Sequence, residues 1–225
     1  MKAPLINQSC HEANPIAKLN RQLLADAGVF AISLGGGPGC GKTSLIEASI
    51  ARLMPDVQVG VIACDVVSHL DGDRMARGTD QVVQVNTGLQ GTPDATHIHD
   101  ALQWLDLAKI DLLFIENVGT LVRTGPQELG ADMSVAMFSV AGGHDKADKH
   151  PELVRSAGVV LLNKTDLLHA VPFDLPAFRS DVRRLNTNIE LFELSALTGD
   201  GLDEWLNWLR FRTKKHHSKT SHWFG

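Results

Sequence analysis

The stretch "VFAISLGGGPGCGKTSLIE", residues 29–47, decides the fold of this chain. It begins with an apolar run as long as a buried strand, passes through glycines and then returns to helical spacing. In between, "GGPGCGKT" (36–43) fits the pattern G-x-x-x-x-G-K-[ST], at the place that the pattern requires, between a strand and a helix. The stretch therefore predicts a loop that binds phosphate.

The residue types of this loop suit a nucleotide bound with Mg²⁺. Glycines let backbone amides wrap closely around phosphate oxygens, and the start of a helix favours an anion. Lys42 can reach the β- and γ-phosphates, while the Thr43 hydroxyl can ligate Mg²⁺. The helix start could also lower the thiol pKa of Cys40, although most cysteines in such places are bystanders. The predicted phosphate-loop contacts are Gly36, Gly37, Pro38, Gly39, Cys40, Gly41, Lys42, Thr43 and Ser44.

Strand and helix patterns alternate along the rest of the chain. Besides 29–36, strands are predicted at 57–65, 81–86, 111–119, 133–140, 158–166 and 188–196. Helices are predicted at 15–28, 42–54, 94–109, 151–156, 175–185 and 201–213. Several strands are continuously apolar, which suits parallel strands that are covered on both faces. The pattern predicts one α/β domain with the P-loop NTPase fold, a three-layer α/β/α arrangement with a mostly parallel sheet. It would span residues 15–213, between a flexible N-terminus (1–14) and a basic, His-containing tail (214–225).

A second motif, "NKTD" (163–166), predicts the base of the nucleotide. The Asp166 carboxylate can accept both the ring N–H and the exocyclic amine of guanine, whereas adenine would leave it unpaired. The Lys164 stem can lie along the base, and Asn163 can brace the loop. Ser195 and Ala196, in "LSALTG" (194–199), resemble the backbone-contacting element of a guanine pocket. We therefore predict that the nucleotide is GTP. The alternative is a small-molecule P-loop kinase, which would not need the N-K-x-D motif at the end of this strand.

Composition and charge limit the compartment and the partners. Apolar residues make up 44% of the chain and charged residues 21%, no apolar run approaches a membrane span of about 20 residues, and the N-terminus has no signal-peptide core. Three cysteines form no paired framework, which indicates a reducing, cytoplasmic setting. Residues 210–225 hold five Lys/Arg and no acid, so the remainder has 16 basic against 26 acidic residues, or −10. We therefore expect no nucleic-acid or membrane partner, and a solvated, frayed tail.

At "ENVG" (116–119) the chain resembles the E-x-x-G element of SIMIBI-class GTPases. Nearly the whole chain, from about residue 14 to 209, then resembles the HypB family, the GTPases that help to insert nickel into [NiFe]-hydrogenase. The matching pieces are "NPIAKLNRQLL", "GGPGCGKTSLIE", "CDVVSHLDGDRM", "ENVGTLV", "FSVAGGHDKADKHP", "VVLLNKTDLL" and "LSALTGDGLDEWLNWL".

The resemblance implies roles for individual residues. Asp65 would lie near Mg²⁺ and the attacking water, while Glu116 and Gly119 would sense the γ-phosphate; Thr43, Asp65 and Glu116 would hold the Mg²⁺. Asp145 and Lys146 match a charged loop near the nucleotide and the partner subunit. The family further implies slow GTP hydrolysis, a GTP-dependent homodimer, and contacts with a nickel metallochaperone and the hydrogenase large subunit.

The chain departs from the family at the usual transition-metal ligands. Their positions are Gly91, Thr92 and Arg123 here, which puts Ni²⁺ or Zn²⁺ binding at that site in doubt. The nearby "TGLQGTPDATHIHD" (87–100) is predicted to start a helix, with Thr92 as N-cap and Pro93 at the first helical position. His97 and His99 would then lie about 200° apart and could not chelate one ion together.

Other candidate metal ligands are Cys64 and His69, which flank Asp65, Cys10 with His11, and the histidines of the tail. Two alternative functions remain open from the sequence. One is a related accessory GTPase for urease or a cobalamin enzyme, although the C-P-H motif of the urease accessory protein is absent. The other is a metal-storage or carrier protein in which the nucleotide is only structural.

Overall fold

The computed structural model describes residues 14–65, 75–88, 92–117 and 128–220. Their strands form one seven-stranded sheet with the order β3-β2-β4-β1-β5-β6-β7, and every neighbouring pair is parallel. The strands are β1 (Phe30–Gly36), β2 (Val59–Asp65), β3 (Val82–Asn86), β4 (Leu112–Glu116), β5 (Met133–Ser139), β6 (Val159–Asn163) and β7 (Glu190–Glu193). The predicted α/β class and parallel sheet are confirmed.

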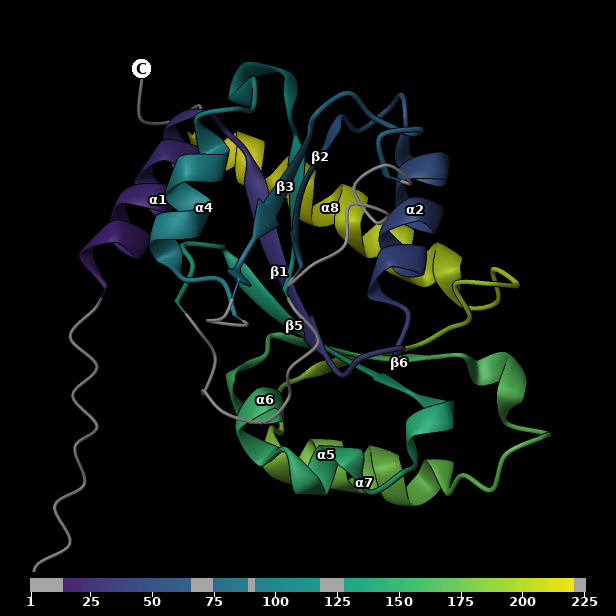
Figure 1. The fold of residues 1–225 in the computed structure, drawn as a ribbon. Helices are drawn as coiled ribbons and strands as arrows, with labels where there is room; N and C mark the ends of the chain where they lie inside the picture. Colours follow the sequence, from purple (N-terminus) through teal and green to yellow (C-terminus); the bar gives the residue numbers. More distant parts are fainter. Residues whose placement is uncertain (1–13, 66–74, 89–91, 118–127, 221–225) are drawn as a thin grey trace, which may run out of the picture.

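Helices cover both faces of the sheet and complete the three layers (Figure 1). They are α1 (Pro15–Asp26), α2 (Lys42–Leu53), α4 (Ala95–Leu102), α5 (Lys146–Lys149), α6 (Pro151–Ser156), α7 (Leu175–Leu185) and α8 (Leu202–Thr220), with short 3-10 turns at Leu107–Lys109, Val140–Gly142 and Thr165–Leu167. One face carries α2 and α8, and the other carries α1 and α4 beside α5, α6 and α7. None of the helices among the described residues has the length and apolarity needed to cross a membrane.

The central strand β1 shows why the strand sequences are continuously apolar. Phe30, Ile32 and Leu34 belong to the core beneath α2 and α8, whereas Ala31 belongs to the core beneath α1 and α4. Successive side chains of a strand point to opposite faces, so a strand covered on both faces must be apolar throughout. Because β4 and β5 pair with β1 on its two sides, the strand order reverses at β1. In open α/β sheets, ligands bind beyond the carboxyl ends of the strands at such a point.

The helix of the histidine-containing stretch begins later and ends earlier than predicted. Its N-cap is Asp94 rather than Thr92, and Pro93 precedes the cap instead of occupying the first helical position. Asp94 Oδ1 accepts hydrogen bonds from the backbone N–H groups of Thr96 and His97, and the His97 ring accepts one from the Asp94 N–H. A carboxylate in a reciprocal capping box stabilises the start of a helix better than the Thr92 hydroxyl would, since it also suits the helix dipole.

The C-terminal segment also differs from the prediction, because α8 continues through Thr220 instead of fraying. Thr213 is buried, and its hydroxyl donates to the carbonyl of Leu209. Two turns of additional helix carry His216 towards Asp132 and His217 towards Asp111, at the amino-terminal edge of the sheet. Contacts with residues far away in the sequence thus hold this end of the helix, which composition alone did not indicate. The short helix α5 was not predicted either, since four residues are too few for a periodic pattern.

Candidate nucleotide site

The phosphate-loop motif joins the carboxyl end of β1 to the first turn of α2. Gly41, the N-cap of α2, has φ 95°, and no side chain caps the helix, so none of its first amides is occupied by a capping side chain. A side chain at Gly41 would meet Asn163, and one at Gly36 would meet the carbonyl of Met137. Both positions therefore require glycine, and the helix start offers backbone donors to an anion.

Lys42 and Thr43 place their polar groups at the carboxyl ends of β1 and β4. Lys42 is 7% exposed, and its ammonium donates to the carbonyls of Gly36 (3.2 Å) and Gly37 (3.4 Å). The Thr43 hydroxyl donates to Oε1 of Glu116 over 2.8 Å. A hydroxyl and a carboxylate side by side supply the oxygen ligands that Mg²⁺ prefers.

The other residues assigned to Mg²⁺ and the γ-phosphate are only partly described. Asp65 is the last residue of β2, two residues beyond the Ala63 that pairs with Glu116, so its backbone lies at the same edge of the sheet. Gly119 lies outside the described residues. Asn117, which the sequence analysis did not select, follows Glu116; its N–H donates to Leu34, and its buried Oδ1 has no hydrogen-bond partner among the described residues. Its place in "ENVG" was the available signal.

Asn163 joins the phosphate loop to the loop that carries Ser195 and Ala196. Its amide donates to the carbonyl of Cys40 (2.9 Å), and its carbonyl accepts from the N–H of Ala196 (2.9 Å). Asn163 is 2% exposed, and Ser195 is fully buried with its hydroxyl accepting from the Thr198 N–H. Two loops from distant parts of the sequence thus lie at fixed positions beside one another, as a base pocket needs.

Asp166 lies beside this bridge, in the turn that follows β6. The preceding Lys164 has φ 63°, a left-handed conformation that a non-glycine residue adopts only when its surroundings impose it. Asp166 Oδ1 is a buried atom with no hydrogen-bond partner among the residues that the structure describes. A buried carboxylate oxygen without a donor is costly, so this geometry suits a ligand with N–H groups.

The two described cysteines carry thiols that resist ionisation. Burial raises the pKa of the Cys40 thiol and outweighs the nearby Lys42, so the lowered pKa considered for this residue is wrong. Burial, and secondarily the carboxylate of Glu116, raises the pKa of Cys64 to about 12. Metals bind the thiolate, so a metal ion at Cys64 would have to displace the thiol proton. His69, Cys10 and His11 lie outside the described residues.

His97 and His99 have separate structural partners. His97 Nδ1 lies 2.8 Å from Asp94, and His99 Nδ1 lies 2.9 Å from Oδ1 of the buried Asn20. The Asn20 amide nitrogen donates to the carbonyls of Ala95 and Leu129, so its Oδ1 must accept and His99 must carry its proton on Nδ1. The described parts of the chain contain no group of three or more His, Cys, Asp or Glu placed to hold a metal ion. Of the three positions where the family's ligands were expected, only Thr92 is described.

The charged "DK" loop forms its own local contacts. Asp145 pairs with Lys149 one turn later, and this hydrogen bond holds the pKa of Asp145 below its usual value. Lys146 is the first residue of α5. Both lie after β5, at the carboxyl edge of the sheet where the phosphate loop lies, as Figure 1 also shows.

The sheet, the phosphate loop and the base loop define a P-loop nucleotide-binding protein of the α/β class. Residues 30–193 match the family model described as "CobW/HypB/UreG, nucleotide-binding domain". The chain belongs to this family and, within it, groups with the hydrogenase maturation factors of the HypB type. The probable hydrogenase maturation factor HypB of Methanocaldococcus jannaschii is 37% identical over 200 residues, which cover 89% of this chain and 90% of that protein. Hydrogenase maturation factor HypB of Escherichia coli K12 is 39% identical over 196 residues, which cover 87% of this chain and 68% of that protein.

Solved structures agree with this grouping. The crystal structure of HypB from Archaeoglobus fulgidus is 36% identical, covers 88% of this chain and 97% of its own, and gives a TM-score of 0.82. The crystal structure of HypB from Helicobacter pylori in complex with nickel is 27% identical to this chain. The match covers 90% of this chain and 95% of that chain, with a TM-score of 0.84. A LAO/AO transport system kinase at 20% identity, with a TM-score of 0.54, shares the fold. The predicted P-loop fold and the resemblance to HypB are thereby confirmed.

Proposed function

We propose that this protein is a Mg²⁺-dependent GTPase that assists metalloenzyme maturation, with nickel incorporation into [NiFe]-hydrogenase as its task. Family membership supports the maturation role. The observation that carries the choice of nucleotide is the buried, unpartnered Oδ1 of Asp166, beside the Asn163 bridge. Guanine presents a ring N–H and an amine to such a carboxylate, whereas adenine presents an acceptor at its ring nitrogen.

The phosphates and Mg²⁺ would lie between the start of α2 and the end of β4. Lys42 and the amides of the phosphate loop neutralise the phosphate charge, and Thr43 with Glu116 supplies oxygen ligands next to them. We assign Asp65 to the Mg²⁺ and the attacking water, and Gly119 to sensing the γ-phosphate. Hydrolysis then needs only positioning and charge neutralisation, without a covalent intermediate, and we expect it to be slow until a partner completes the site.

Base specificity tests this proposal directly. The intact chain should bind GTP at least a hundredfold more tightly than ATP in a titration with Mg²⁺. Asp166→Asn replaces one hydrogen-bond acceptor by a donor. It should therefore weaken the binding of GTP and strengthen the binding of XTP, whose base carries a carbonyl where guanine has its amine. The exposed Asp56→Asn, an identical change elsewhere on the surface, should leave both affinities unchanged. Equal affinity for ATP and GTP in the unmodified protein would overturn the assignment.

We further propose that GTP drives formation of a homodimer, and that a nickel-carrying protein and the hydrogenase large subunit act with it. A nucleotide-dependent change of assembly is the output that a γ-phosphate sensor at Glu116 and Gly119 provides. The free thiols of Cys40 and Cys64 suit work in the cytoplasm. Sedimentation with a non-hydrolysable GTP analogue tests the dimer: the analogue should raise the mass towards two chains and GDP should not. A monomer under both conditions would contradict it.

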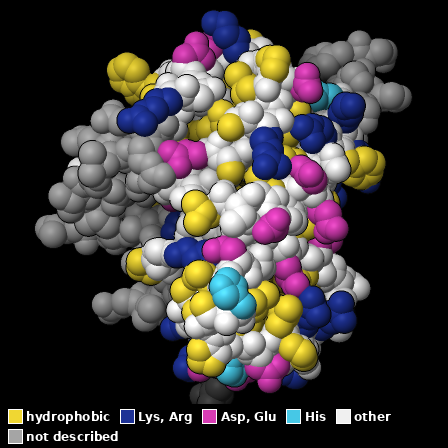
Figure 2. All heavy atoms as spheres, turned by 90° about the vertical axis from the view of Figure 1, so that its right-hand side faces the viewer, with side chains coloured by type: hydrophobic (Ala, Val, Ile, Leu, Met, Phe, Trp, Pro, Cys, Tyr) yellow, Lys and Arg dark blue, Asp and Glu magenta, His cyan; other side chains and the backbone are white. Residues whose placement is uncertain are grey.

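We expect no nucleic-acid partner, and Figure 2 shows the charge pattern of one face of the molecule. Basic and acidic side chains alternate across it and do not gather by sign. A nucleic-acid surface needs a contiguous basic patch to neutralise phosphates. This face therefore lacks the charge pattern of such a surface.

A further inference from the structure

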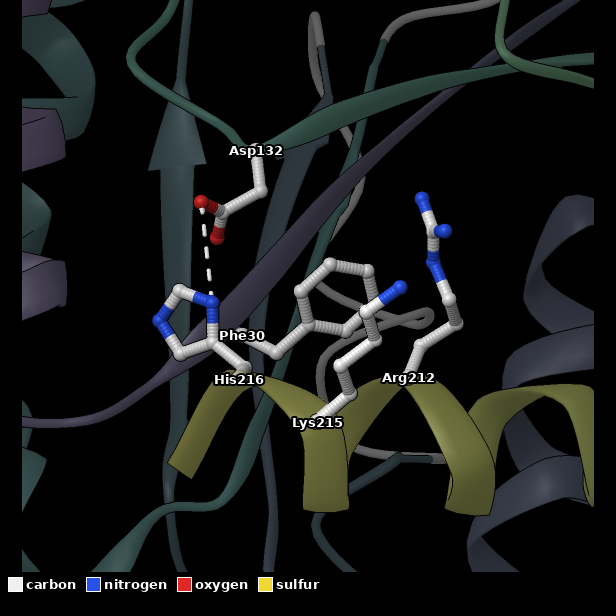
Figure 3. Close-up of a pocket in the computed structure, with 5 residues that line it drawn as sticks. All are labelled: Phe30, Asp132, Arg212, Lys215 and His216. Atoms are coloured by element: carbon white, nitrogen blue, oxygen red, sulfur yellow. Dashed lines mark ion pairs between the residues drawn. The ribbon is translucent and has the colours of Figure 1, made fainter. Parts of the chain in front are cut away.

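A second concave site lies at the end of β1 that is remote from the phosphate loop. It is a pocket of about 210 Å³, lined by Phe30, Asp132, Arg212, Lys215 and His216. Figure 3 shows Arg212, Lys215 and His216 rising from one side of α8 towards the ring of Phe30, with Asp132 above His216. Phe30 is the first residue of β1, whereas the phosphate loop follows its last residue, Gly36. A strand of seven residues separates the two sites by about 20 Å.

Arg212 is the main source of positive charge in the pocket. Its guanidinium lies 5.2 Å from the ring centre of Trp208 and 6.0 Å from that of Phe30, and Nη2 lies 3.8 Å from the sulfur of Met133. Within the described part of the chain no carboxylate forms an ion pair with Arg212. The side chain is half-buried against aromatic rings, which orient its planar fork but do not neutralise it.

The acid in the pocket is engaged elsewhere. Asp132 Oδ2 accepts a 2.8 Å hydrogen bond from the N–H of Ala31, and Oδ1 lies 3.9 Å from Nδ1 of His216. In Figure 3 Asp132 and His216 lie on the other side of the Phe30 ring from Arg212. Lys215, three residues after Arg212 on the same helix, adds a second cation to the lining. The wall formed by α8 thus carries two cationic side chains, Arg212 and Lys215.

We propose that this pocket binds a small oxyanion compound, a carboxylate or a phosphate, through Arg212 with the help of Lys215. The guanidinium fork matches the two oxygens of such a group and forms paired, charge-assisted hydrogen bonds with it. The volume lies below the range of about 300–1,000 Å³ that drug-sized ligands occupy, so the ligand is small. This site is independent of the proposed GTP site, since none of its lining residues belongs to the phosphate or base loops.

The test is a titration of the full-length protein with inorganic phosphate and, separately, with succinate. NMR signals of the Arg212 Nε–H and the Trp208 indole N–H report on this pocket, and backbone signals of the phosphate loop report on occupancy there. We expect saturable shifts of both side chains with a dissociation constant in the millimolar range or below. The probe that acts at lower concentration tells whether the natural ligand is a phosphate or a carboxylate. No saturable shift at Arg212 and Trp208 with either probe, or shifts confined to the phosphate loop, would overturn the proposal.

A charge-removing variant with a matched control completes the test. Arg212→Met keeps an apolar stem against Phe30 and Trp208 and removes the fork, so binding should weaken at least tenfold. Arg183→Met makes the same change at an exposed position of α7 and should bind like the unmodified protein. Thermal unfolding verifies that both variants fold, and their nucleotide affinities should match the unmodified chain. Equal probe affinities in the two variants would contradict the role of Arg212, whatever the nucleotide titrations show.

Discussion

The hydroxyl of Thr43 donates a 2.8 Å hydrogen bond to Oε1 of Glu116, across 73 residues of sequence. Thr43 is the second residue of α2, the helix after the phosphate loop, and Glu116 ends β4, the strand that pairs with β1. The contact thus places the predicted Mg²⁺ ligand of the loop beside the predicted sensor of the γ-phosphate. Two motifs that were recognised separately in the sequence meet at one point.

Thr43→Ala should weaken binding of a GTP analogue only when Mg²⁺ is present. Loss of one ligand or hydrogen bond to a charged group costs about 1.5–3 kcal/mol, roughly ten- to hundredfold in affinity. Calorimetric titrations with Mg²⁺ and with EDTA measure the two cases, and the exposed Thr96→Ala on α4 is the control. An equal loss in EDTA would show that Thr43 acts on the fold or the phosphate instead of the metal.

The buried thiol of Cys64 should make the protein less stable at alkaline pH. Its pKa of about 12 in the folded protein lies above the ordinary value of 9.0, so between these values the unfolded chain loses the proton first. The stability present below pH 9 therefore decreases as the pH rises towards 12, by up to about 1.4 kcal/mol per pH unit.

Urea unfolding at pH 8, 9 and 10 measures this dependence. Cys64→Ala should flatten the decline, although its absolute stability also changes because a small cavity forms. The raised pKa of Cys40 remains in both proteins and cancels in the comparison. Identical slopes in the two proteins would refute the assignment to Cys64.

Asn20→Ala should lower the free energy of unfolding by roughly 2–4 kcal/mol. The buried amide of Asn20 satisfies the carbonyls of Ala95 and Leu129 and orients His99, and each buried polar group left unpaired costs about 1–3 kcal/mol. Urea denaturation gives the value. Gln22→Ala, on the exposed side of α1, should cost less than about 0.5 kcal/mol. Similar costs for the two variants would mean that the Asn20 network adds little.

Nickel binding should not depend on Cys64. Cys64 is buried, and the described residues place no group of three or more His, Cys, Asp or Glu that could hold a metal ion with it. We therefore expect equal Ni²⁺ and Zn²⁺ binding by the unmodified chain and Cys64→Ala in equilibrium dialysis, with and without a GTP analogue. A nucleotide-dependent site of about one metal per two chains that Cys64→Ala abolishes would prove the prediction wrong.

Local sequence patterns predicted the helices and strands well where the residues of the segment itself determine its structure. The helices at 151–156 and 175–185 have the predicted bounds, and the strands begin within two residues of theirs. Predictions failed where distant contacts decide the outcome. The helix α8 continues through Thr220 because the sheet edge holds its last turns. The predicted N-cap of α4 was wrong for a local reason, since Asp94 and His97 cap this helix together.

The sequence by itself determined that a strand, a glycine loop and a helix form a phosphate site, since these depend on residue type and short-range spacing. The sequence also predicted that Asp166 in "NKTD" contacts the base of the nucleotide. Only the tertiary structure decided that Asn163 joins the phosphate loop to Ala196 and that Cys40 and Cys64 have raised pKa values. It also decided that Arg212 lies against the ring of Phe30. Burial, long-range hydrogen bonds and pairing of charges arise from chain segments that meet only in the folded protein, and no local pattern contains them.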